Sequence, residues 1–440
     1  MLKNITAPIA SGALAGLSAV AARTAIAQGV ITCEQLVASC LERIEERDPQ
    51  VMAWAWLDRE QALEQARLAD RSASNGLLRG IPVGVKDIID VHGMRTGFNS
   101  PVYPHYHPAM DAAAVALIRR AGGVILGKTV TTEFANRAPG PTMNPYDSQR
   151  TPGGSSSGSA AAVADYQAML SLGTQTSGSV IRPASYCGAV GYKPTFGEFS
   201  RVGVKAQSGS LDTLGLCARS VGDAELFRAA IMAIPYQPVP PADRRLRIAV
   251  CRPPEWPSAE LSSRRLIEDY AGKLAGRHHR VMDLDLAPEL FDDWLSVHRV
   301  IANFESARSL AFEKINHRHQ LSEKLYQGRI RDGENIPLEG YIQAQLKAEA
   351  MRAHIDKAFD EADVILTLAT AGEATPGLAD TGSATFNSLW TLLYMPCISL
   401  PAGFGPAGMP LSIQLVGRRF HDEALFSAAL AIETFISEQE

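Results

Sequence analysis

The chain has 440 residues, of which 46% are hydrophobic and 20% are charged, so it can build a large core and is not a disordered chain. Its net charge of −5, without a sustained run of Lys and Arg, excludes an extended surface for nucleic acid or anionic membrane. Six widely spaced cysteines fit neither a disulfide scaffold nor a paired-cysteine zinc site, so we expect reduced thiols in the cytoplasm.

The first part of the chain is predicted to form helices that lead into one buried strand. Helical spacing starts near Leu17, and the first sixteen residues lack the strong apolar core of a signal peptide. Thr32 before Glu34-Gln35 predicts a capped helix that ends at Asp48-Pro49. After a second helix over 60–72, the apolar run Gly80–Lys86 predicts a buried strand that ends in a lysine.

The alternation of helix and strand continues to the C-terminus. A helix over 112–121 precedes a strand at 124–126, residues 151–191 are rich in Gly, Ser and Ala, and a Pro-rich segment over 233–242 marks a boundary or a long crossover. The remaining elements are a strand over 246–250, helices over 288–359, and strands centred on 364–366, 397–400 and 411–415.

This pattern predicts an α/β fold in a single domain over 1–440. We divide it into an N-terminal helical region at 1–79, a core at 80–230 and a C-terminal half at 245–440. The two halves are expected to share one mixed sheet. No run of eighteen apolar residues is present, so no membrane-spanning helix is expected.

Two segments match catalytic motifs but lie in the wrong context. Gly122–Thr129 matches the phosphate-binding pattern G-x-x-x-x-G-K-T, yet a helix precedes it and a strand lies inside it, whereas a phosphate loop follows a strand and opens a helix. Gly154–Gly158 matches the G-x-S-x-G elbow of α/β-hydrolases, which would make Ser156 the nucleophile. The polar segment 144–150 before it is not a strand, which disfavours this interpretation.

Lys86 is a candidate general base for the attack of a serine on an amide. Its position at the end of an apolar strand favours the neutral amine, because desolvation opposes the charged form, and only a neutral lysine can act as a general base. The competing explanation is a structural ion pair with Asp87.

Two Gly/Ser-rich segments, Thr151–Ser159 (TPGGSSSGS) and Gly173–Pro183 (GTQTSGSVIRP), supply candidate nucleophiles. A serine attacks an amide only with a base beside it and donors for the oxyanion. The small residues Ser177 and Gly178 let backbone N–H groups just before and at Ser179 approach a substrate carbonyl. Alternatively, both segments are turns between buried elements.

Together these residues resemble the amidase signature family, whose pattern runs here from about residue 80 to 195 and whose layout covers the whole chain. The resemblance implies a central, mixed, twisted β-sheet with helices on both faces, and chemistry without metal or cofactor. It implies Lys86 as general base, Ser155 as proton relay after a cis peptide bond, and Ser179 as the nucleophile that forms an acyl-enzyme. The implied oxyanion donors are the backbone N–H groups of Thr176, Ser177, Gly178 and Ser179.

Within the family, the chain is most similar to the bacterial malonamidase branch, through Gly173–Thr176, Ser179–Pro183 and the segments 301–305 and 389–392. In that branch, the arginine three residues after the nucleophile binds a substrate carboxylate, which implies this role for Arg182. A structural role for that arginine, tying loops together, is the alternative.

Two positions depart from the family pattern. Ser177 stands where glycine is usual, and it would be strained if its φ were positive. Gln175 replaces the commoner aspartate.

We therefore expect a cytoplasmic amidase, a hydrolase of linear amide C–N bonds, that converts a small and acidic monoamide such as a malonamate-like compound to the acid and ammonia. The expected partner is a small-molecule amide, with no nucleic acid and no membrane, and homodimerisation is left open. The alternatives are the amidase subunit of a glutamine-dependent tRNA amidotransferase, an aryl or carbamoyl amide hydrolase of the same family, and an esterase that uses Ser156.

Overall fold

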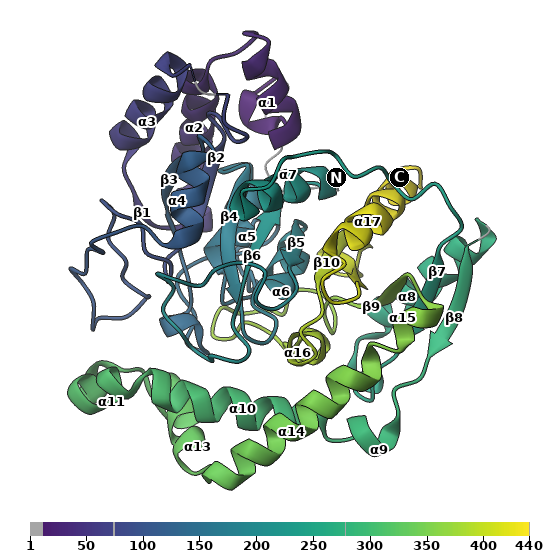
Figure 1. The fold of residues 1–440 in the computed structure, drawn as a ribbon. Coiled ribbons are helices and arrows are strands. Elements are labelled where there is room, and N and C mark those ends of the chain that lie inside the picture. The colour runs from purple at the N-terminus through teal and green to yellow at the C-terminus, as the bar shows by residue number, and fades with distance from the viewer. Residues whose placement is uncertain (1–11, 74, 278, 440) are drawn as a thin grey trace.

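The computed structural model describes residues 12–73, 75–277 and 279–439, so residues 1–11 of the expected N-terminal region lie outside the described residues. Within the described residues, eleven strands form one sheet in the order β1-β3-β2-β4-β6-β5-β10-β11-β9-β7-β8 (Figure 1). The strands are β1 (Trp54–Leu57), β2 (Pro82–Lys86), β3 (Val124–Thr129), β4 (Leu170–Gln175), β5 (Val190–Lys193), β6 (Thr213–Ala218), β7 (Arg247–Cys251), β8 (Arg280–Leu284), β9 (Val364–Leu368), β10 (Cys397–Phe404) and β11 (Pro410–Val416).

The α-helices pack around this sheet and extend beyond its edge at α10, α11, α13 and α14 (Figure 1). They are α1 (Ala19–Ala27), α2 (Cys33–Val51), α3 (Arg59–Arg71), α4 (Ala113–Arg120), α5 (Ser157–Ala164), α6 (Ile181–Cys187), α7 (Val221–Met232), α8 (Leu261–Gly276), α9 (Pro288–Phe291), α10 (Trp294–Ser309), α11 (Ala311–His317), α12 (Glu323–Leu325), α13 (Arg331–Glu334), α14 (Leu338–Ile355), α15 (Ala358–Glu361), α16 (Thr385–Leu392) and α17 (Asp422–Ser437). Across the described residues, no helix combines the length and apolar composition needed to cross a bilayer.

The sheet is mixed, as expected, and it joins the two halves of the chain. Strands β2, β3 and β4 run parallel to one another, as do β7, β8 and β9, whereas the central pairs are antiparallel. The halves meet where β5 pairs with β10, with Tyr192 opposite Ile398. The prediction of one shared sheet is therefore confirmed.

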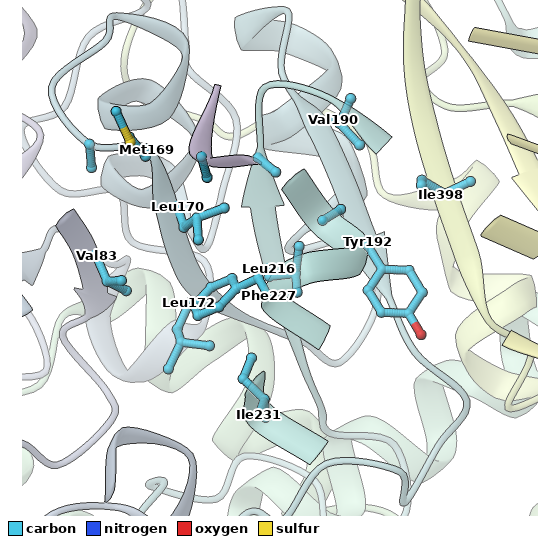
Figure 2. Close-up of a cluster of buried hydrophobic side chains, with 14 of the residues drawn as sticks. Val83, Met169, Leu170, Leu172, Val190, Tyr192, Leu216, Phe227, Ile231 and Ile398 are labelled. Carbon is cyan, nitrogen blue, oxygen red and sulfur yellow. The ribbon is translucent and has the colours of Figure 1, made fainter. Parts of the chain in front are cut away.

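Both faces of the sheet are covered. On one face, Leu170 and Leu172 of β4 pack in a cluster with Phe227 and Ile231 of α7 (Figure 2). On the other face, Cys217 of β6 packs with the buried alanines of α5 and with α6. Since alternate residues of a strand point to opposite faces, these two clusters lie on opposite sides of the sheet.

Most predicted elements are present, and one predicted boundary is wrong. Thr32 caps α2 through the expected capping box with Gln35. The helix does not stop at Asp48-Pro49 but runs on to Val51, because a proline removes only one helical N–H and here affects only the last turn. The Pro-rich segment over 233–242 is a crossover from α7 to β7.

Candidate active site

Adjacent strands bring the candidate catalytic residues to one edge of the sheet. Strands β2 and β4 are parallel neighbours, so Lys86 at the end of β2 and the loop after β4 lie at the same edge. That loop carries Ser179, and Ser155 lies just before α5. In parallel arrangements this edge, at the carboxyl ends of strands, is where ligands commonly bind.

Lys86 is fully buried and contacts Ser155 directly. Its Nζ donates hydrogen bonds to Ser155 Oγ at 2.7 Å and to Thr174 Oγ1 at 2.7 Å. Burial holds the pKa of Lys86 well below its ordinary value of 10.5, and the more weakly acting Asp212 carboxylate opposes this shift. The competing ion pair with Asp87 is not formed, because Asp87 instead accepts a hydrogen bond from Lys128 at 3.0 Å.

A backbone hydrogen bond joins the segments that carry Ser155 and Ser179. The peptide bond between Gly154 and Ser155 is cis, as the family resemblance implied. The next residue, Ser156, donates its backbone N–H to the carbonyl oxygen of Ser179 at 3.2 Å. Of the three proposed catalytic residues, Ser179 alone lines the pocket that is also lined by His298 and Arg182. One segment thus carries a serine that lines the pocket, and the segment bonded to it carries a second serine that contacts a buried amine.

The loop at 176–179 presents backbone N–H groups for an oxyanion. Within the described part of the chain, none of these four N–H groups donates a hydrogen bond. Ser177 does not have a positive φ, so the strain considered for this position is absent. Gln175 replaces an aspartate without loss of its acceptor function, because its Oε1 accepts from the N–H groups of Val180 at 2.9 Å and Ile181 at 3.1 Å.

Substitution of Gly178 with alanine is expected to reduce activity by about 10-fold or more, because small displacements in a catalytic site are costly. A Cβ atom at this position would lie 2.5 Å from Asn387 Oδ1, so the loop or Asn387 must move. Asn387 is held by a hydrogen bond from its Nδ2 to the Ala369 carbonyl oxygen at 2.9 Å. Amide hydrolysis and thermal unfolding of G178A would measure the effect.

Gly222→Ala is the matched control for this prediction. Gly222 lies in α7, and a Cβ atom there meets nothing within 4 Å. Alanine is the better helix former, so this variant should keep full activity with equal or slightly higher stability. Wild-type turnover by G178A would contradict the close-packed loop.

Arg182 is buried and bound mainly to backbone oxygens. Its guanidinium donates to the carbonyl oxygens of Gly382 at 2.7 Å and Gly154 at 2.6 Å, and to Thr381 Oγ1 at 3.2 Å. Its Nε has no hydrogen-bond partner among the described residues, and the side chain lines the pocket. These bonds show that the arginine ties loops together. Because its Nε donor is unused, a carboxylate-binding role is compatible with this geometry and stays a prediction.

The pocket at Ser179 has a volume of about 270 Å³ and a cationic lining. Besides Arg182, three further arginines line it, whereas Asp380 is the one acidic residue among the described lining residues. These arginines are Arg137, Arg299 and Arg329. Burial and the neighbouring Arg137 lower the pKa of Arg329 to about 10. The pocket thus favours a substrate that carries negative charge.

No sequence motif indicated a role for Arg137, Arg299 or Arg329. The same holds for His298 and Thr391, which contact the loop at 176–179. His298 is buried on the apolar stripe of α10 that includes Ile301 and Ala302, a spacing that could have located it. The arginines come from separate loops and helices, and no local pattern joins them.

The two rejected motifs have structural roles. In Gly122–Thr129, β3 occupies the segment where a phosphate loop would lie, and Lys128 is buried against Asp87 and Thr96. Ser156 is buried, and its Oγ hydrogen bonds with the backbone of Thr174. No strand directly precedes Ser156, as the polar sequence before it predicted.

Known proteins of similar sequence and fold identify the family of this chain. The family model "Amidase" matches residues 35–426. A relative from Oleidesulfovibrio alaskensis, named as one subunit of a glutamyl-tRNA(Gln) amidotransferase, is 34% identical over 93% of this chain and 95% of its own length. The peptide amidase from Stenotrophomonas maltophilia is 28% identical, with a TM-score of 0.83 over 96% of this chain and 97% of its own.

A third match is a solved structure described as a vestigial protein complex that reveals the origins of an s-triazine catabolic enzyme. It has a TM-score of 0.87 and 26% identity, and covers 95% of this chain and 98% of its own. None of these three matches is named a malonamidase, so similarity to that branch stays a prediction.

The comparisons also overturn one expectation. The predicted partner set was a small-molecule amide without nucleic acid and without membrane, with homodimerisation left open, and its restriction to a small molecule is wrong. The curated relative is by name one subunit of a tRNA amidotransferase, and the structural neighbour comes from a protein complex. That expectation was based on the total charge and on the absence of a basic run. Neither property indicates whether a protein partner binds. With a family model matched over most of its length, the chain belongs to the amidase family and is an enzyme that acts on amide C–N bonds.

Proposed function

We propose that this chain is the amidase subunit of a glutamine-dependent tRNA amidotransferase, in which it releases ammonia from the side-chain amide of glutamine. The observation that carries this proposal is the cationic pocket at Ser179, which contains a single acidic residue, Asp380, among its described lining residues. Free glutamine carries an α-carboxylate and an α-ammonium group besides its amide, and this pocket offers a partner for each.

The proposed chemistry uses the Ser–Ser–Lys arrangement. Neutral Lys86 takes the proton of Ser155, Ser155 takes that of Ser179, and Ser179 Oγ attacks the amide carbon. The N–H groups of residues 176–179 stabilise the oxyanion. As the C–N bond breaks, the proton returns to the leaving nitrogen and ammonia departs. Water then attacks the acyl-enzyme by the same proton route and releases glutamate.

The charged groups of the pocket support an amino-acid amide. An arginine guanidinium matches a carboxylate in shape and charge. Arg137 and Arg299 are exposed and can adapt to a ligand, whereas Arg329 is anchored by a hydrogen bond from Nη1 to Asn303 Oδ1 at 2.8 Å. The exposed carboxylate of Asp380 accepts the N–H of Gly382 at 2.9 Å and contacts Lys324 at 3.3 Å, and its remaining lone pairs can accept from an ammonium group.

The proposed place in a multi-subunit enzyme draws on the curated relative, which covers nearly the whole of both chains. It implies at least one protein partner and a charged tRNA as the final acceptor of ammonia. We further propose that residues 1–440 form one amidase domain and that the protein works in the cytoplasm, where its six buried free cysteines stay reduced.

A malonamate-like monoamide is the second candidate substrate, favoured by the unused Nε donor of Arg182 beside the pocket. Such a compound has a carboxylate close to its amide but no ammonium group. The two candidates therefore differ in their need for Asp380.

We expect Arg299→Ala to raise KM for both glutamine and malonamate by about 10-fold, because an ionic hydrogen bond contributes about 1.5–3 kcal/mol. Asp380→Asn should raise KM for glutamine alone. The measurement is ammonia release from glutamine, malonamate and the neutral amide propionamide, which should respond to neither variant. Arg71→Ala, on the exposed face of α3, is the control.

The proposed role in a larger enzyme is tested by reconstitution. The purified chain should show weak glutaminase activity that rises when the partner subunits and glutamyl-tRNA(Gln) are added. High activity on malonamate alone, without response to partners or to glutamine, would reject this proposal in favour of the second candidate.

A further inference from the structure

We infer that His298 and Thr391 are positioning residues that aim the backbone N–H groups of the oxyanion loop, defined as residues 176–179. The inference depends on the proposed role of Ser179 as nucleophile. It concerns two helices, α10 and α16, that belong to the C-terminal half of the chain, whereas the loop belongs to the N-terminal half.

The two side chains hold two consecutive peptide units by their carbonyl oxygens. His298 Nε2 lies 3.0 Å from the carbonyl oxygen of Thr176, and Thr391 Oγ1 donates to the carbonyl oxygen of Ser177 at 2.7 Å. In a trans peptide the C=O and N–H bonds point in opposite directions. Fixing these oxygens therefore fixes the directions of the N–H groups of Ser177 and Gly178, which have no hydrogen-bond acceptor among the described residues.

The environment of His298 defines its protonation state and tautomer. Burial lowers the pKa of His298 to about 4, so the imidazole is neutral at working pH. A carbonyl oxygen only accepts hydrogen bonds, so Nε2 must carry the single proton and donate it to Thr176. Ser177 Oγ lies 3.4 Å from the same nitrogen, so the serine found in place of the usual glycine adds a second contact.

Gln175 orients the hydroxyl of Thr391. Gln175 Nε2 donates to Thr391 Oγ1 at 3.1 Å, and this occupies one acceptor site of the hydroxyl. The single hydroxyl proton then has two acceptors in reach, the Ser177 carbonyl oxygen at 2.7 Å and the Asn387 carbonyl oxygen at 3.2 Å, and the shorter contact favours Ser177. An aspartate at position 175 could not donate to Thr391, so this chain of hydrogen bonds depends on the glutamine.

These contacts also strengthen the donors they aim. A peptide whose carbonyl oxygen accepts a hydrogen bond has a more polarised N–H group, because hydrogen bonds in a chain reinforce one another. An oxyanion hole works when its donors are already oriented before charge develops. Loss of either contact should therefore affect the transition state more than substrate binding.

The first test replaces Thr391 by valine, which has nearly the same shape without the hydroxyl. We expect kcat for ammonia release from L-glutamine to fall by about 10- to 100-fold, while KM stays within about 2-fold of the wild-type value. This fall in kcat is smaller than the one expected for loss of a whole oxyanion donor. Thr391→Ser keeps a hydroxyl and should recover most of the rate. If T391V does not fold, the smaller Thr391→Ala takes its place.

Thr367→Val is the matched control. Thr367 is a fully buried threonine of β9 whose hydroxyl also donates to a backbone carbonyl oxygen, that of Cys251 at 2.9 Å, outside the pocket. It should lose stability as T391V does but keep wild-type kcat. Equal loss of kcat in both valine variants would overturn the inference, since the effect would then be structural.

The second test separates positioning by His298 from acid–base chemistry. Glutamine can place an amide N–H near the position of Nε2, so His298→Gln should keep at least about a tenth of wild-type kcat with an unchanged pH profile, whereas His298→Leu should lose about 10- to 100-fold. Equal loss in both variants, or a changed pH profile in H298Q, would overturn the positioning role.

A fluorophosphonate probe makes the outcome independent of the amide substrate. It phosphonylates an activated serine, with fluoride as the leaving group and the phosphonyl oxygen in the oxyanion hole, so the labelling rate of T391V and H298L should fall about as much as kcat. Absence of labelling in wild type would reject the nucleophile assignment itself. Labelling of both variants at the wild-type rate would reject only the positioning role.

Discussion

Replacement of Ser179 with alanine is expected to lower kcat for amide hydrolysis by about 10⁶-fold, the scale seen when a serine nucleophile is removed. Ser179 lines the pocket, and its hydroxyl makes no hydrogen bond within the described part of the chain. The variant should therefore unfold at the same temperature as wild type and keep its affinity for substrate. Ammonia release, thermal unfolding and hydroxylamine trapping of the acyl-enzyme in wild type would measure this.

Ser156→Ala is the decisive control, since Ser156 belongs to the alternative G-x-S-x-G motif. Its hydroxyl is buried and hydrogen bonds with the backbone of Thr174 at 3.2 Å. The alanine variant should lose about 1–3 kcal/mol of stability and keep most of its activity. The reverse pattern, an inactive S156A beside an active S179A, would establish the esterase-type assignment instead.

Sequence periodicity predicted the elements whose cores are locally apolar. The run Gly80–Lys86 became β2, and the capping pattern at Thr32 placed the start of α2. Strand β4 (LSLGTQ) was missed because its residues facing α5 are small. A Cβ atom at Gly173 would lie 2.8 Å from Oγ of Ser156, the residue before α5, so close tertiary packing selects glycine there.

The candidate site divides in the same way. Lys86 ends an apolar run, and Ser155 and Ser179 lie in Gly/Ser-rich segments, so the sequence alone could propose all three. His298, Thr391 and the pocket arginines lie on helices and loops distant in the chain, and their roles exist only after the two halves share one sheet. Helical spacing could place His298 on a buried face, but it could not tell a histidine that holds the loop from one that only packs in the core.

Replacement of Lys86 is expected to have the second largest effect. Lys86→Met keeps the length of the side chain without the amine, and it should lower kcat by about 10⁴-fold, the upper range for a general base. Lys86→Arg should be similarly inactive, because a guanidinium stays protonated and cannot accept the proton of Ser155. The measurement is ammonia release by the pure variants at saturating substrate.

Lys128→Met is the matched control, because Lys128 is equally buried and lies on the neighbouring strand β3. It pairs with Asp87 instead of with the serines proposed to be catalytic. Its loss leaves a buried carboxylate without its partner and should cost about 3–5 kcal/mol of stability, with kcat close to wild type in the folded fraction. An active K86M beside an inactive K128M would reverse the assignment of the general base.

The pH dependence of Lys86 links catalysis to stability. Because burial lowers the pKa of Lys86, the neutral base is present above that lowered pKa, and kcat should fall as pH drops through it. Between the lowered pKa and the ordinary value of 10.5, the unfolded chain binds one more proton than the folded chain at this group. Stability from this residue therefore rises with pH by about 1.4 kcal/mol per unit in that window.

K86M removes this contribution, so its stability relative to wild type should increase as pH falls from 10.5 toward the lowered pKa. Urea unfolding of both proteins at several pH values measures the difference directly, and other titrating groups cancel in the comparison. In the pH range in which Lys86 is neutral and can act as a base, its burial therefore lowers the stability of the folded chain. A stability difference that does not change with pH, together with a pH-independent kcat, would mean that Lys86 is not held neutral by burial.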